Sequence, residues 1–140
     1  MFCDDLFNPK FVLVAPVIND DPTRPLDRAA FAGFVERAIA AWNLENGIDP
    51  KSVPTVRDAA VELLEPCVGD AMRIDIWVEH LDETSCVYGF LCSSEDGRVP
   101  YARGEETITK LDPQSKRPAA WSPAFRHTHE MLMKELPAFA

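Results

Sequence analysis

One stretch of the sequence would form a helix with apolar residues on almost every side, and this limits the possible folds more than any other feature. Within 29–41 the charged residues are Glu36 and Arg37, and apolar side chains point in nearly all directions around the helix axis. A helix of this kind is usually buried, and this one is too short and too interrupted to cross a membrane. The sequence therefore predicts a buried helix over about 25–46, with Pro25 at its first position.

The rest of the chain consists mainly of short β-type segments separated by turns. Segment 72–80 alternates, with one face formed by apolar side chains and the other mainly by polar ones, which indicates a strand with one buried face. The apolar face holds Met72, Ile74, Ile76 and Val78, and the other holds Arg73, Asp75, Trp77 and Glu79. The turns between the later strands are too short for crossover connections, so we expect an antiparallel sheet. Ser122 and Pro123 have the residue types that begin a helix, predicted to run through Leu136. The predicted strands cover 11–18, 54–64, 72–80, 85–92 and 99–111.

Composition narrows the class of protein. The chain has 140 residues, 46% of them apolar, which suits a single domain with a hydrophobic core. A net charge of −9 argues against nucleic acid as a partner, because phosphate binding needs a concentrated basic surface. The four cysteines lack zinc-like spacing and are expected to be reduced and mostly buried. No basic signal-peptide start or membrane span is present, so a cytoplasmic location is expected.

The predicted elements follow one another in the order strand, long helix, four strands and a last helix. Three short motifs occur along this series of elements. They are Asp21-Pro22 followed by the aromatic Phe31, then Val53-Pro54, then Gly69-Asp70 ahead of the alternating strand. In this order the motifs resemble the hotdog-fold thioesterases, in particular the 4-hydroxybenzoyl-CoA thioesterase family. The resemblance covers roughly 11–111.

The resemblance implies an α+β hotdog fold over residues 1–140, in which a curved antiparallel sheet of about five strands wraps a long central helix. It also implies hydrolysis of an acyl-CoA or acyl-carrier-protein thioester, with coenzyme A as part of the substrate and no other cofactor. A homodimer or homotetramer is implied as well, because hotdog proteins typically pair their sheets edge to edge.

Hydrolysis of a thioester needs a nucleophile or general base and donors for the developing oxyanion. The start of the helix supplies free amides, which we expect at Leu26, Asp27 and Arg28. By resemblance, Asp21 matches the catalytic carboxylate of the family and would act as nucleophile or general base. The alternative is that Asp21 is an ordinary turn residue.

Glu36 is a second candidate carboxylate, because related hotdog enzymes place a working acid on the central helix. An acid in an apolar helix is costly unless it is paired or faces a cavity. The alternative is therefore a salt bridge, to Arg73 or Arg37.

Basic residues near the last strand are candidates for binding the phosphates of CoA. The alternative is that they form a solubilising scatter of surface charge. The candidates are Arg103, Lys110, Lys116 and Arg117, with Arg126 further along.

The histidines bear on a competing function, that of a hotdog dehydratase, which uses a histidine together with a carboxylate. His80, His127 and His129 lie outside the helix and its leading loop, which weakens this alternative. His127 and His129 are expected on the solvated face of the last helix.

A catalytically silent module that binds an acyl ligand or serves as an assembly subunit is the remaining alternative. It is favoured by Thr23-Arg24-Pro25, which stands where the family has a glycine. Neither a Gly-x-Ser-x-Gly elbow nor a metal-ligand spacing is present in the sequence.

Overall fold

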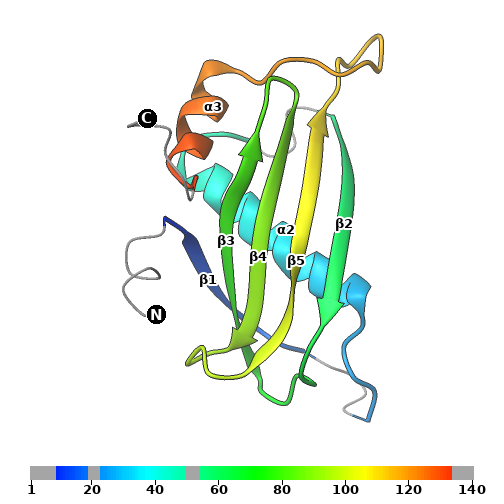
Figure 1. The fold of residues 1–140 in the computed structure, drawn as a ribbon, viewed down its shortest axis with the longest axis vertical. Helices are drawn as coiled ribbons and strands as arrows, with labels where there is room; N and C mark the ends of the chain where they lie inside the picture. Colours follow the sequence, from blue (N-terminus) through cyan, green and yellow to red (C-terminus); the bar gives the residue numbers. More distant parts are fainter. Residues whose placement is uncertain (1–8, 19–22, 50–53, 134–140) are drawn as a thin grey trace.

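The structure is a computed structural model that describes residues 9–18, 23–49 and 54–133. These form one five-stranded antiparallel sheet and two helices (Figure 1). The elements in chain order are β1 (Phe11–Pro16), α2 (Arg28–Glu45), β2 (Thr55–Leu63), β3 (Ala71–Leu81), β4 (Ser85–Ser94), β5 (Pro100–Lys110) and α3 (Pro123–Glu130).

The sheet has the strand order β1-β3-β4-β5-β2, and α2 crosses one of its faces (Figure 1). The core lies between them, because β3 and β4 each turn alternate side chains toward the helix. Phe31, Val35 and Ile39 of α2 are buried in this core, as are Ile74 and Ile76 of β3. The predicted hotdog architecture, with five antiparallel strands around a long helix, is confirmed.

The outer side of α2 is exposed, and here the prediction of a helix buried all round is wrong. Ala29, Gly33, Glu36 and Arg37 face solvent. The physical reason is that a single sheet covers only one side of a helix. Apolar composition around the whole axis therefore did not correspond to burial around the whole axis.

The start of α2 also differs from the prediction. The helix begins at Arg28, and Asp27 is its N-cap, with a side-chain oxygen that accepts a hydrogen bond from the Ala30 amide at 2.9 Å. An Asp cap provides this acceptor, whereas Pro25 provides none. Pro25 therefore stands three positions before the first helical residue, Arg28, instead of opening the helix.

The last helix begins as predicted but ends earlier. Ser122 caps it by accepting from the Phe125 amide at 3.1 Å, and Pro123 is its first residue. The helix ends at Glu130 because the next residues turn to pair with β3, where the Val78 amide donates to the Leu132 carbonyl at 2.9 Å. The predicted extension to 136 is therefore wrong over 131–133, and 134–136 lies outside the described residues.

The cysteines that the structure describes are free. Cys86 and Cys92 are buried, and this burial raises the pKa of both thiols to about 12. Cys67 is half-buried, and Cys3 lies outside the described residues. In the described part of the chain, neither helix has the length and hydropathy needed for a membrane crossing.

Candidate functional site

The N-terminal turn of α2 contains backbone amides that no acceptor within the helix satisfies. The Asp27 side chain accepts from the Ala30 amide, and the Asp27 carbonyl accepts from the Phe31 amide at 3.2 Å. The amides of Arg28 and Ala29 have no acceptor within the helix, and they lie at the positive end of its dipole. Such a turn can bind a carbonyl oxygen that is gaining negative charge.

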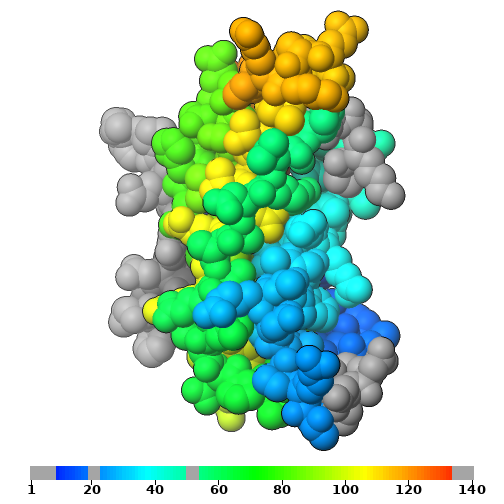
Figure 2. All heavy atoms as spheres, turned by 90° about the vertical axis from the view of Figure 1, so that its right-hand side faces the viewer, coloured from blue at the N-terminus to red at the C-terminus, as the bar shows by residue number. Residues whose placement is uncertain are grey.

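This placement corrects the predicted set of donors. Leu26 and Asp27 precede the helix, so their amides do not belong to its first turn, whereas that of Arg28 does. The Arg28 side chain has a structural role. Its Nε donates to the Val61 carbonyl at 3.1 Å, and this hydrogen bond links the start of α2 to β2. Figure 2 shows this turn, in blue, at the surface beside the green of β2.

Asp21 lies outside the described residues, so its predicted role as nucleophile or general base stays a prediction. Along the chain it stands seven residues before Arg28, in the connection between β1 and α2.

Glu36 is exposed on α2, at the border of the solvent-facing side with β2. Its carboxylate is 3.9 Å from Nε of Arg57, which also donates from Nη1 to the buried Glu106 at 2.6 Å. An ion pair was one of the two expectations for Glu36, but its partner is neither Arg73 nor Arg37. Arg73 pairs with Asp75 at 2.7 Å, and the Arg37 guanidinium lies 5.2 Å above the Phe34 ring.

The four candidate cations are not gathered at one place. Arg103 is paired with Glu62 at 2.9 Å on an exposed part of the β2–β5 pair. Lys110 donates to the Ala120 carbonyl at 2.7 Å. Lys116 and Arg117 lie in the loop after β5, at the end of the molecule opposite the start of α2 (Figure 1).

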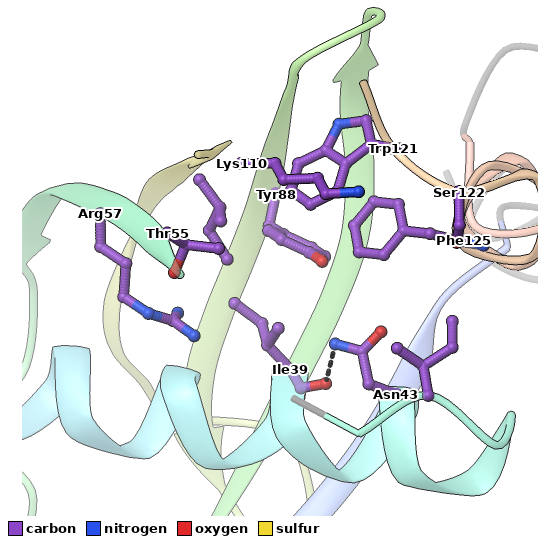
Figure 3. A pocket seen from close by; sticks show the side chains of 11 residues that line it. Ile39, Asn43, Thr55, Arg57, Tyr88, Lys110, Trp121, Ser122 and Phe125 are labelled. Carbon is purple, nitrogen blue, oxygen red and sulfur yellow. Dashed lines mark hydrogen bonds between the residues drawn. The ribbon is translucent and has the colours of Figure 1, made fainter. Parts of the chain in front are cut away.

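A cavity near the other end of α2 was not predicted. It has a volume of about 230 Å³ and lies between α2, strands β2, β4 and β5, and the start of α3 (Figure 3). Its polar lining includes Asn43 and Tyr88, whose side chains are buried. An asparagine within an apolar helical segment is the one sequence signal that could have indicated it.

Behind this cavity lies His129, for which the predicted solvated position is wrong. His129 is fully buried, because α3 folds back over the end of the core and stacks His129 on Phe125, with ring centroids 3.7 Å apart. Its Nε2 is 2.6 Å from the Tyr88 hydroxyl. His127, on the same helix, is exposed as expected.

Within the described residues, no group of three or more His, Cys, Asp or Glu side chains is arranged to hold a metal ion.

Comparison with known proteins identifies the fold. No family model and no curated protein matches the sequence, whereas many solved structures match the fold. One is a 1,4-dihydroxy-2-naphthoyl-CoA thioesterase from Synechocystis, with a TM-score of 0.75 and 12% identity over 85% of this chain and 94% of the other. A predicted thioesterase from Bacillus stearothermophilus has a TM-score of 0.75 and 14% identity over 91% and 98%.

A third match is a hypothetical protein from Staphylococcus aureus in complex with CoA. Its TM-score is 0.69, with 14% identity over 86% of this chain and 82% of the other. The chain thus has the hotdog fold of structures that are named thioesterases. At these identities the likeness establishes the fold, and function has to be argued from the site.

Proposed function

We propose that this protein is an acyl thioesterase that hydrolyses an acyl-CoA or acyl-carrier-protein thioester to a free acid and a free thiol. The observation that carries the proposal is the open first turn of α2, where the amides of Arg28 and Ala29 lack acceptors within the helix. The connection that contains Asp21 leads directly into this turn.

In the proposed reaction, the carbonyl oxygen of the thioester accepts hydrogen bonds from these two amides. Asp21 either attacks the carbonyl carbon or removes a proton from the attacking water. The carbon–sulfur bond then breaks and the thiolate leaves. If Asp21 is the nucleophile, this leaves an acyl–Asp21 anhydride, which water hydrolyses to the free acid and the restored carboxylate; if Asp21 is the base, water has already added its oxygen to the acyl carbon. In both routes a proton from that water ends on the thiolate. Water is the only co-reactant.

Glu36 is less suited to this role than Asp21. It stands eight residues after Arg28, which corresponds to about 12 Å along the helix axis. It forms an ion pair with Arg57, which supports a structural role between α2 and β2.

The proposed CoA contacts involve a second copy of the chain. The loop after β5, which contains Lys116 and Arg117, lies at the end of the molecule opposite the first turn of α2 (Figure 1). A thioester held at that turn would therefore meet these cations more readily on a neighbouring subunit. This arrangement accords with the homodimer or homotetramer that the sequence resemblance implies.

The test is release of free thiol from a panel of thioesters that differ in chain length and aromaticity, presented on CoA and on an acyl carrier protein. We expect turnover on at least one substrate class, with one thiol and one acid formed per thioester consumed. Absence of turnover on every thioester would contradict the proposal and favour a binding module.

A further inference from the structure

The cavity beneath α3 is separate from the proposed reaction site. Ile39 and Asn43 contribute to its lining from α2, and Ile39 stands eleven residues after Arg28. This corresponds to about 16 Å along the helix axis from the first turn. Nothing in the proposed hydrolysis uses this cavity, so its lining needs an explanation of its own.

Asn43 brings an unpaired acceptor to the cavity. Its side chain is buried, with 5% of the residue exposed, and its Nδ2 donates to the Ile39 carbonyl at 3.1 Å. Its Oδ1 has no hydrogen-bond partner among the described residues. Figure 3 shows this side chain rising from α2 toward Tyr88 and Phe125. Leaving such an oxygen unsatisfied is costly, which points to a donor from a bound molecule.

Tyr88 supplies a second acceptor. His129 Nδ1 lies 2.8 Å from the Phe125 carbonyl, which can only accept, so the ring proton is on Nδ1. His129 Nε2 then accepts from the Tyr88 hydroxyl at 2.6 Å. Because the Tyr88 hydroxyl donates its hydrogen to His129, its oxygen can only accept a hydrogen bond from a molecule in the cavity.

The charged residues of the lining narrow the ligand further. Arg57 is already paired with Glu106, but Lys110 has no ion-pair partner among the described residues and would repel a cationic amine. An ionised carboxylate has no hydrogen to donate and would leave Asn43 Oδ1 without a partner. A neutral group with a hydrogen to donate satisfies both conditions.

Trp121 Nε1 is a buried donor in the lining that also has no partner among the described residues, so a hydroxyl group, which donates and accepts, suits the cavity. The hydroxyls of Thr55 and Ser122 can donate or accept and do not discriminate.

The apolar walls favour a flat molecule. The rings of Trp121 and Phe125 stack with centroids 3.9 Å apart and planes inclined by 10°, while isoleucines line other parts of the cavity. The volume of about 230 Å³ exceeds the roughly 150 Å³ of an apolar cavity that binds benzene. A fused pair of aromatic rings is a suitable size.

We propose that this cavity is a binding site for a small neutral aromatic alcohol, which donates its hydroxyl hydrogen to Asn43 Oδ1 or to the Tyr88 oxygen. The aromatic body packs against Phe125 and the isoleucines. The site is independent of the proposed hydrolysis.

Calorimetric titration with 2-naphthol tests the proposal, with 2-methoxynaphthalene as a ligand of similar shape that cannot donate. We expect saturable binding of one 2-naphthol per chain, about tenfold tighter than the methoxy compound. Absence of saturable binding, or equal affinity for both compounds, would overturn the proposal. Because no turnover is measured, either result leaves the proposed hydrolysis untouched.

Two variants locate the binding. Asn43→Leu should weaken 2-naphthol about tenfold and leave 2-methoxynaphthalene unchanged, whereas the exposed neighbour Leu44→Ala should alter neither. Ile48→Phe adds volume to the lining and should abolish binding of both compounds. If 2-naphthol binds a folded Ile48→Phe chain as tightly as the wild type, the site lies elsewhere.

Discussion

The burial of His129 determines its protonation at the scale of a single residue. The side chain lies beneath α3, and this burial lowers its pKa from 6.5 to about 4. The unfolded chain therefore takes up a proton below about pH 6.5, whereas the native chain does not until about pH 4. Neutral His129 stabilises the fold above this window, and the stabilisation is lost as the pH falls through it.

The predicted consequence is a stability that falls steeply between pH 7 and pH 4.5. Urea unfolding should show the wild type losing about 2–3 kcal/mol more than His129→Gln over this range, because the variant has no imidazole to protonate. His127→Gln, on the exposed side of the same helix, should behave as the wild type. Equal losses for the wild type and His129→Gln would contradict this account of the residue.

A second prediction concerns the pair formed by Arg57 and Glu106. Glu106 is buried, which raises the pKa of its carboxyl, and the Arg57 guanidinium at 2.6 Å opposes that effect. Arg57→Met leaves a buried carboxylate without its partner and should cost about 3 kcal/mol of unfolding free energy. Adding Glu106→Gln should recover most of the loss.

Chemical denaturation of the four proteins of this double-mutant cycle measures the coupling. A near-zero coupling energy, with the two single effects simply adding, would show that the pair does not hold β2 to the rest of the sheet.

At the scale of elements, the pairing of β5 with β2 depends on Gly104. A Cβ at this position would overlap the carbonyl oxygen of Ala60 in β2 and would lie 3.2 Å from the Phe90 ring. Gly104→Ala should therefore destabilise the fold by about 3 kcal/mol. The measurement is the midpoint of denaturant unfolding.

Gly33 provides the matched control within α2. No atom lies within 4 Å of the place where its Cβ would be, and the position is exposed. Gly33→Ala should stabilise the chain by about 0.5–1 kcal/mol through a lower backbone entropy of the unfolded state. If both substitutions change stability equally, crowding against β2 is not the reason for Gly104.

At the scale of the whole molecule, local patterns predicted the fold well. The apolar face formed by every second residue of β3 and the short turns after it predict a meander of strands, and an apolar helix needs a sheet to cover it. The exposed side of α2 was not predictable, because the pattern does not show how much of a helix one sheet can cover. His129 was misjudged for a related reason, since its burial depends on α3 folding back.

The site was predicted less completely than the fold. The first turn of α2 was expected as the source of amides, and Arg28 lies there, but the position of the cap shifted the donors by two residues. The cavity lined by Asn43 and Tyr88 combines residues far apart in the sequence, and only tertiary packing brings them together. Residue spacing alone could not indicate it.

The central claim is that the first turn of α2 and Asp21 together hydrolyse a thioester. The direct measurement is kcat for thiol release by Asp21→Asn and by its neighbour Asp20→Asn, on whichever thioester the wild type turns over. Loss of the carboxylate should lower kcat about a hundredfold or more in Asp21→Asn, while Asp20→Asn keeps a rate close to that of the wild type. Unchanged turnover in a folded Asp21→Asn variant would contradict the claim.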